Sequence, residues 1–303
     1  MKKSFLFIIF LFLFFTGFSQ TKKTYVYSII GKDTLKLDVY TPDNLTASDS
    51  LPVLIWMHGG SFMSGNRDNS SEKKLAEIVT QKGFIGVSIS YRLTRKGEST
   101  GFGCECTKEE KISTFKNAII DYLDASLYIY KNSKAFNVDR TKMIAGGSSA
   151  GAEVVLNAVY LKDYFLKDSP KYNELKFAGI LSLSGAVLTA DYINKNNAIP
   201  TMLFHGTSDR LVPYYSASHH KCDFSKPGYL KLDGSYVIAK KLKELDSSYY
   251  LYAVKGGKHE ISSIPFEKIN VILDFFNQAS FNKKKVQTKK VVKKASVIFS
   301  SEY

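Results

Sequence analysis

The stretch of sequence that decides the fold is MIAGGSSAGAEVVL, residues 143–156. Its apolar start, residues 143–145, predicts a buried strand, and the residues from Ala152 onward predict a helix. Between them, residues 147–151 match the pattern G-x-S-x-G, with Ser149 at the centre and Ser148 as its neighbour. Glycines two positions either side of a serine let strand and helix approach closely, in a turn that exposes the serine at the strand end. The alternative interpretation is a glycine-rich turn that only packs a helix on a sheet.

The rest of the chain alternates between strand and helix signals. An apolar run at 25–30, a turn at 31–33 and alternating polarity over 35–39 predict an antiparallel hairpin. Short apolar runs, typical of strands covered on both faces, follow at 53–57, 84–89, 143–145, 179–183, 202–204 and 250–254. Helices are predicted from Ser70 or Ser71 to Gly83, from the capping box Thr107-x-x-Glu110 to Lys131, and around 238–245 and 269–276. The pattern predicts an α/β fold in one domain, residues 24–280: a mostly parallel sheet of about eight strands with helices on both faces.

Residues 1–19 have the pattern of a secretory signal peptide. Lys2 and Lys3 precede an apolar run at 5–15, and Gly17 and Ser19 are small residues at positions −3 and −1 of a cleavage site. The competing interpretation is a membrane anchor. A spanning helix needs roughly 20 apolar residues, and this run is too short for that. We expect a mature chain that has no transmembrane segment and is secreted or periplasmic.

The positive charge is concentrated in the C-terminal tail. The formal net charge is +14, and residues 281–303 contain seven lysines. So dense a run of like charges repels itself, which predicts a solvated, poorly ordered basic tail that is dispensable for catalysis. The alternative is weak contact of the tail with an anionic surface. The remaining body is mildly basic and lacks zinc-finger spacing, an RNP-like motif and a basic helix, so we expect no nucleic-acid partner.

The chain has three cysteines, Cys104, Cys106 and Cys222. In an oxidising compartment they leave one disulfide and one odd thiol, or three free thiols. Cys104 and Cys106 are separated by one residue and pair poorly with each other. We therefore expect one of them to bond to Cys222 and to tie loop 92–106 to loop 206–233, and we take Cys106–Cys222 as the candidate pair.

A loop rich in glycine follows the predicted strand 53–57. It reads His58-Gly59-Gly60, and adjacent glycines leave backbone N–H groups uncovered, as an oxyanion-binding site requires. The candidate donors are the N–H groups of Gly59, Gly60 and Ala150. We expect His58 to order this loop by hydrogen bonding.

A serine hydroxyl becomes nucleophilic when a histidine accepts its proton and a carboxylate orients that histidine. The histidines are His58, His205, His219, His220 and His259. His259 is the candidate base, because it lies between the last predicted strand and the last helix. Asp209 is the candidate acid, just after the strand 202–204, and Asp223 is its competitor. Ser149, Asp209 and His259 all follow strands, at the sheet edge where ligands bind in open parallel sheets.

Four other polar residues invite a functional interpretation. His205 closely follows a strand and is expected to be partly buried and structural, whereas His219 and His220 lie in the long loop and could line a site. Glu153 stands in the first turn of the helix after Ser149. The helix dipole is an adequate explanation for a carboxylate there.

Four ordered motifs resemble those of α/β-hydrolases of the secreted bacterial carboxylesterase and lipase type. They are H-G-G-S-F at 58–62, G-x-S-x-G at 147–151, H-G-x-x-D-x-x-V-P at 205–213 and G-G-x-H at 256–259. The resemblance covers nearly the whole mature chain except the tail. It implies the α/β-hydrolase fold and a serine carboxylic-ester hydrolase that forms an acyl-enzyme. No cofactor is expected, and no metal, because no group of His, Cys, Asp or Glu has ligand spacing.

Two departures from the family pattern bear on the substrate. Ser61 stands where relatives have a third glycine, and the interval from Ser149 to Asp209 has no room for a large lid. We therefore expect short-acyl esters or carbohydrate-linked esters, such as acetylated or feruloylated polysaccharide. The rival functions are a prolyl-oligopeptidase-type serine peptidase, which usually carries a large extra domain, and an inactive binding protein on the same fold.

Overall fold

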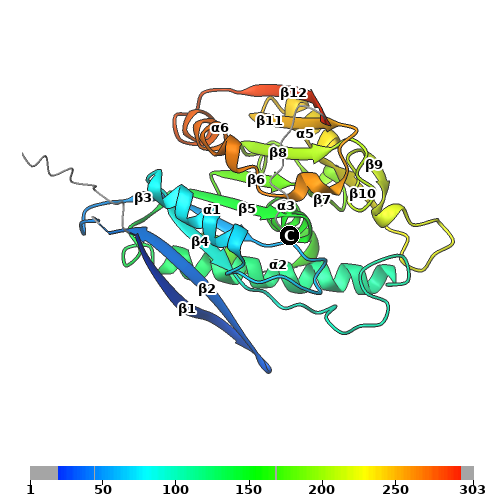
Figure 1. Ribbon diagram of the computed structural model, residues 1–303, viewed down its shortest axis with the longest axis horizontal. Coiled ribbons are helices and arrows are strands. Elements are labelled where there is room, and N and C mark those ends of the chain that lie inside the picture. Colours follow the sequence, from blue (N-terminus) through cyan, green and yellow to red (C-terminus); the bar gives the residue numbers. More distant parts are fainter. Residues whose placement is uncertain (1–19, 44, 168, 295–303) are drawn as a thin grey trace, which may run out of the picture.

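The computed structural model describes residues 20–43, 45–167 and 169–294, so the proposed signal peptide lies outside the described residues. Its main sheet has nine strands (Figure 1). They are β1 (Gln20–Ile30), β2 (Asp33–Pro42), β3 (Leu51–Met57), β4 (Ile85–Ile89), β5 (Val138–Ser148), β6 (Gly179–Leu183), β8 (Thr201–Gly206), β11 (Tyr249–Lys255) and β12 (Gln287–Lys293). The strand order is β1-β2-β4-β3-β5-β6-β8-β11-β12.

Most neighbouring strands run parallel. The exceptions are β1 with β2 and β2 with β4, which pair antiparallel. The predicted α/β class, with a mostly parallel sheet and an N-terminal hairpin, is therefore confirmed. The sheet has nine strands where about eight were predicted.

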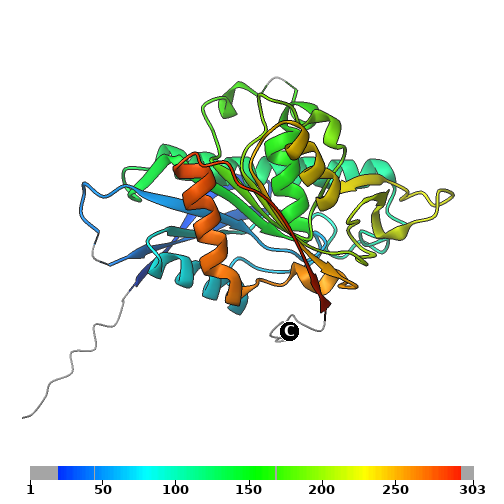
Figure 2. The ribbon, with the colours of Figure 1, turned by 90° about the horizontal axis from the view of Figure 1, so that it is seen from above.

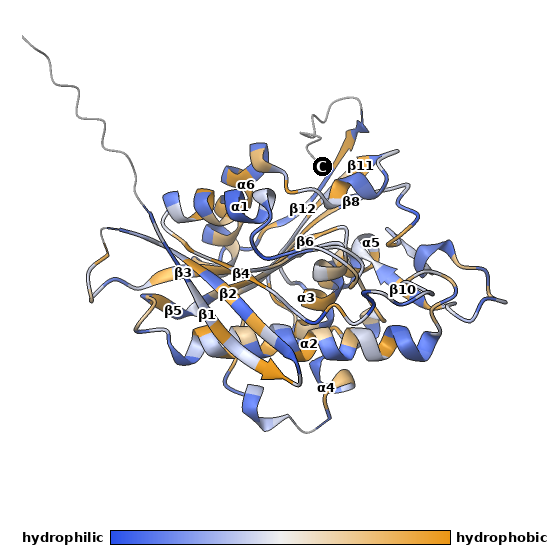
Figure 3. Ribbon diagram, turned by 60° about the horizontal axis from the view of Figure 1, so that its bottom comes forward, coloured by the Kyte–Doolittle hydropathy of each residue, from blue (hydrophilic) through white to orange (hydrophobic). Residues whose placement is uncertain are grey.

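Two hydrophobic cores lie on opposite faces of the sheet, because successive strand side chains point to opposite sides. In β3, Val53, Ile55 and Met57 belong to the larger core, and Leu54 and Trp56 belong to the smaller one. Figure 3 shows the apolar colour gathered in the central strands.

The helices cover the two faces in separate groups (Figure 2). The larger core is covered by α2 (Lys108–Lys131), α3 (Ala150–Tyr160) and α5 (Ser235–Glu244). The smaller core is covered by α1 (Ser70–Gln81) and by α6 (Ile269–Phe275) with its wider last turns, η6 (Phe276–Phe281). No helix in the described ranges is long and apolar enough to cross a membrane.

The N-terminus of α2 is fixed by the predicted capping box. Glu110 N donates to Thr107 Oγ1 at 3.2 Å, and Thr107 N donates to Glu110 Oε2 at 2.7 Å. Two otherwise unpaired backbone donors are thereby satisfied.

Short elements connect the long ones. Between α3 and β6 lie α4 (Lys162–Phe165) and η1 (Pro170–Tyr172), and between β6 and β8 lie β7 (Ala186–Val187) and η2 (Ala190–Tyr192). The long loop after β8 contains β9 (Ser216–Ser218), η3 (His219–Lys221) and β10 (Lys231–Gly234). β7, β10 and β9 form a second, three-stranded sheet. After β11 come η4 (His259–Ser262) and η5 (Phe266–Lys268).

The prediction of a solvated tail from residue 281 is wrong for the segment that forms β12. This strand pairs in parallel with β11 over seven positions, from Tyr249 with Gln287 to Lys255 with Lys293. Val292 packs against the smaller core, and the Lys290 ammonium lies 5.9 Å from the ring centroid of Tyr252. The ammonium groups of the lysines stay solvated, while the aliphatic parts of their side chains cover the sheet edge. The domain therefore extends beyond residue 280.

The candidate pair Cys106–Cys222 is also wrong, because the disulfide joins Cys104 to Cys222 with Cα atoms 5.3 Å apart. Gly228 N donates to Cys104 O at 2.9 Å, so backbone pairing brings residue 104 to the long loop. The Cys106 side chain is a free thiol that lies fully buried in the larger core. The expected tie between loops 92–106 and 206–233 is present.

Candidate active site

Ser149 lies in a sharp turn between β5 and α3, with φ 50° and ψ −123°. A non-glycine residue in this region of φ is strained, and such strain clusters at functional sites. The flanking residues must be glycine because a side chain at either position would collide with backbone atoms. A Cβ on Gly151 would lie 2.2 Å from Met57 O, and a Cβ on Gly147 would lie 2.6 Å from the carbonyl of Gly151. The predicted strand-to-helix turn is therefore built as the motif implies.

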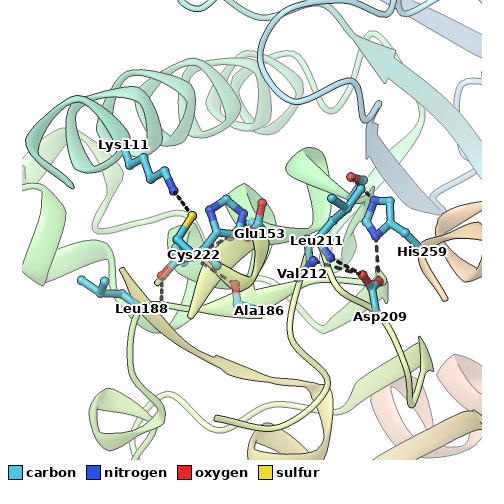
Figure 4. A network of polar contacts seen from close by, with 12 residues as sticks. Lys111, Glu153, Ala186, Leu188, Asp209, Leu211, Val212, Cys222 and His259 are labelled. Carbon is cyan, nitrogen blue, oxygen red and sulfur yellow. Dashed lines mark hydrogen bonds and ion pairs between the residues drawn. The ribbon is translucent and has the colours of Figure 1, made fainter. Parts of the chain in front are cut away.

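The structure brings His259, in the turn after β11, next to Ser149, in the turn after β5. His259 begins η4, and its Nε2 lies 2.7 Å from Ser149 Oγ. Its Nδ1 lies 2.7 Å from Asp209 Oδ2 (Figure 4). A carboxylate only accepts hydrogen bonds, so Nδ1 carries the proton and Nε2 is free to accept from the serine hydroxyl. This arrangement can move a proton from Ser149 to His259.

The Asp209 carboxylate is fully buried in the turn after β8. Its Oδ1 accepts hydrogen bonds from Leu211 N at 2.9 Å and Val212 N at 3.1 Å. Burial alone would raise the pKa of Asp209, but His205 and His259 outweigh it and hold the pKa well below its ordinary value. The carboxylate is therefore ionised at neutral pH.

Asp223, the competitor of Asp209, lies elsewhere, and His205 lies beside Asp209, with its Nε2 3.5 Å from Asp209 Oδ2. Asp223 hydrogen-bonds Ser225 in an exposed turn, with no contact to His259. His205 is fully buried and binds Ser235 Oγ at 2.8 Å through Nδ1 and Val212 O at 3.1 Å through Nε2. It supports the turn that carries Asp209, in agreement with the structural role predicted for it.

The glycine-rich loop packs directly against Ser149. A Cβ on Gly59 would lie 3.1 Å from Ser149 Cβ, and Gly60 has φ 114°, which side chains rarely allow. Tyr91 OH donates to His58 O at 3.1 Å, and His58 Nδ1 lies 2.7 Å from Gly59 O. The loop is thus held by its own histidine, as predicted. Ala150 begins α3, so its N–H is one of those left without a partner inside the helix.

Sequence reasoning missed a buried polar cluster beside this site. The Glu153 side chain (Figure 4) is almost fully buried, and its Oε1 lies 3.3 Å from Nε2 of the fully buried His219. Lys111 Nζ, also buried, donates to Gly228 O at 2.7 Å. A helix that is apolar all round is buried on every side, and residues 150–160 have that composition. That signal could have identified Glu153 as a buried carboxyl group.

The described residues contain no cluster of three or more His, Cys, Asp or Glu side chains that could hold a metal ion. The groups that meet at Ser149 are an imidazole, a carboxylate and backbone N–H groups. These are the groups used in acyl transfer through a serine.

Comparison with known proteins agrees with this architecture. Residues 37–187 match the BD-FAE family model. The chain is 32% identical to Carboxylesterase 1E of Mus musculus over 166 residues, which is 54% of this chain and 26% of that protein. It is 31% identical to Secreted lipase 1 of Botryotinia fuckeliana over 169 residues, 54% of this chain and 28% of that protein. The aligned stretch thus spans about a quarter of these relatives' length.

Among solved structures, the apo form of Thermogutta terrifontis esterase 2 superposes with a TM-score of 0.65. The superposition covers 86% of this chain and 95% of that one at 16% sequence identity, so the likeness concerns the fold. Fold and site together define an α/β-hydrolase with a serine at the strand-to-helix turn. Within that class, the chain is similar to carboxylesterases and lipases and matches the BD-FAE family over residues 37–187.

Two buried histidines, His58 and His219, and the partly buried His220 make the folded state sensitive to acid. Burial lowers the pKa of His58 to about 4 and that of His220 to about 4, and it lowers the pKa of His219 well below the ordinary value. Each folded-state pKa lies below its unfolded value, so their stabilisation is complete above about pH 6.5 and is lost as the pH falls toward 4. Burial raises the pKa of Glu153, which acts in the opposite sense.

We therefore expect the free energy of unfolding to fall between pH 6.5 and pH 4.5. The three histidines take up protons on unfolding across this window, against Glu153 and the less strongly raised Glu72 and Asp121, so we expect a net uptake of protons. Urea unfolding at a series of pH values measures this slope. A free energy of unfolding that stays constant across the window would contradict the prediction. The pKa of Asp209 is lowered on folding from about 3.8, so Asp209 affects the free energy of unfolding only below that pH, outside the window.

Proposed function

We propose that the protein is a carboxylic-ester hydrolase that acts through Ser149, His259 and Asp209. The observation that carries this proposal is the unbroken chain of contacts from Ser149 Oγ to His259 Nε2 at 2.7 Å and from His259 Nδ1 to Asp209 Oδ2 at 2.7 Å. The strained conformation of Ser149 and the buried, ionised state of Asp209 support it.

In the proposed reaction, His259 accepts the hydroxyl proton as Ser149 attacks the ester carbonyl. The N–H groups of Gly59, Gly60 and Ala150 stabilise the negative oxygen of the tetrahedral intermediate. His259 then donates its proton to the leaving alcohol, and an acyl-enzyme forms. Water activated by the same histidine releases the acid, while Asp209 keeps the imidazole in the correct tautomer.

The proposed location is outside the cytoplasm, secreted or periplasmic. The proposal rests on the signal-peptide pattern of residues 1–19 and on the disulfide between Cys104 and Cys222. Disulfides persist mainly in oxidising compartments. The name of one relative, Secreted lipase 1, is compatible with this location.

We expect short acyl groups to be preferred over long ones by at least about tenfold in kcat/KM, since each methylene that fits or fails to fit a pocket changes rates by that order. Between α3 and β8 the described residues form the sheet strand β6 and four short elements, α4, η1, β7 and η2, so this segment supplies no large apolar cap. Aryl esters of increasing acyl length measure the preference. Long-chain triglyceride emulsions hydrolysed as fast as butyryl esters would contradict it.

The substrate class is tested on the same protein with acetylated and feruloylated sugars and with aminoacyl-prolyl amides. Carbohydrate-linked esters are proposed substrates. Cleavage of the amides in preference to the esters would instead identify a serine peptidase. No turnover of any compound by the folded protein would indicate a binding protein on this fold.

A further inference from the structure

The turn η3 has a backbone conformation that side chains rarely adopt. His220 has φ 55° and Lys221 has φ 55°, so two consecutive non-glycine residues lie in the left-handed region. Such a conformation persists only when the surrounding structure holds it in place. The contacts of η3 therefore fall into two groups: those that fix this turn in place, and the one through which it positions a neighbouring segment.

Three contacts fix the turn to the body of the protein. Cys222, the next residue after η3, is bonded to Cys104. His219 N donates to Leu230 O at 2.8 Å. The His219 ring lies between Glu153, whose Oε1 is 3.3 Å from Nε2, and the ring of Phe102, whose centroid is 5.3 Å away. Of these contacts, the disulfide is the covalent one.

The turn reaches Asp209 through a single peptide group. His220 N donates to Leu211 O at 2.7 Å. The same peptide group carries the N–H of Val212, which donates to Asp209 Oδ1 at 3.1 Å. A peptide group is planar, so its carbonyl and N–H cannot be reoriented independently. A displacement of His220 therefore changes the direction of a hydrogen bond to the carboxylate that orients His259.

We propose that Cys104 and Cys222 are positioning residues for the reaction, because their disulfide holds η3 and η3 aims the Leu211–Val212 peptide at Asp209. The inference rests on the proposed function, since it concerns how well Asp209 orients His259. The disulfide-bonded protein is the fully active form. Reduction by a dithiol, which is itself oxidised to a disulfide as the two protein thiols form, lowers kcat while the fold remains.

The test is the double variant Cys104→Ala/Cys222→Ala, assayed on a short aryl ester well below its melting temperature. We expect kcat to fall about 10- to 100-fold, the loss typical of a small misplacement of a catalytic group. KM should change little, because η3 acts on the acid and not on the substrate. The acid limb of the kcat/KM profile should move to lower pH, because the imidazolium loses part of its carboxylate partner.

Two further variants separate positioning from simple stabilisation. Cys106→Ala is the matched control, since it removes the other cysteine of the same loop, and its kcat and pH profile should equal those of the wild type. Adding Lys221→Gly to the double variant should restore most of kcat, because glycine adopts positive φ without strain. Lys221 is exposed and contributes no group to the proposed site.

An unchanged kcat and pH profile in the folded double variant would overturn the inference. So would a loss of kcat that Lys221→Gly does not restore. If the double variant does not fold, wild-type protein reduced with a dithiol and then reoxidised gives the same comparison, with reversible loss of kcat expected and unchanged kcat contradicting it. No turnover of any ester by the oxidised wild type would refute the proposed function itself, which is a different result.

Discussion

Ser149→Ala is expected to abolish ester hydrolysis, with kcat/KM reduced on the order of 10⁶-fold, the cost of removing a serine nucleophile from such a group of residues. The hydroxyl is the atom that would attack the ester, and its Oγ lies 2.7 Å from His259 Nε2. The substitution removes one oxygen from a side chain without changing the turn. Folding, measured by a thermal melt, should therefore be unaffected.

Ser148→Ala is the matched control, one position away in the same turn. Its hydroxyl has no contact to His259, so hydrolysis should continue. A fluorophosphonate should label the wild type and the Ser148 variant and fail to label the Ser149 variant. Turnover or labelling retained after Ser149→Ala would refute the assigned nucleophile.

Ending the chain after Val286 is expected to lower both stability and activity. Without β12, the outward N–H and C=O groups of β11 lose their partners, and Val292 no longer covers the smaller core. The truncation also removes Lys294, whose Nζ lies 2.6 Å from Glu260 Oε1 beside His259. We expect the free energy of unfolding to fall by about 2 kcal/mol, and the melting temperature to fall by roughly 4–8 °C for a domain of this size.

The control is a chain that ends after Lys294, which keeps all of β12 and the contact with Glu260. Thermal melts and an ester assay on both truncations make the comparison. If the shorter chain melts and hydrolyses esters like the longer one, the tail is dispensable, as its lysine content alone suggested.

Local sequence was sufficient to predict the elements that depend on local geometry. The turn at Ser149 needs glycine at 147 and 151 because backbone carbonyls occupy the space of a side chain. The start of α2 needs Thr107 and Glu110 because they bond each other's backbone. The proximity of Ser149, Asp209 and His259 could be predicted for another reason, since residues that follow parallel strands meet at one edge of a sheet.

The features that could not be predicted depend on partners far along the chain. Residues 287–293 read QTKKVVK, with two adjacent valines in place of an alternating pattern, and they become a strand because β11 offers an unpaired edge. Cys104, and not Cys106, forms the disulfide because a backbone hydrogen bond with Gly228 brings residue 104 to the loop that contains Cys222. Glu153 is buried because η3, more than sixty residues away in sequence, places His219 against it.

The two edges of the main sheet, β1 and β12, have a consequence for self-association. An edge strand presents a row of unpaired N–H and C=O groups to which a second copy could add its own edge. Both edges carry lysines, namely Lys22, Lys23, Lys289, Lys290 and Lys293. Ile29, near the tip of the hairpin, is 70% exposed and offers an apolar contact. Repulsion between these lysines opposes pairing of copies at both edges, and this repulsion fades as salt shortens its range to about 3 Å at 1 M ionic strength.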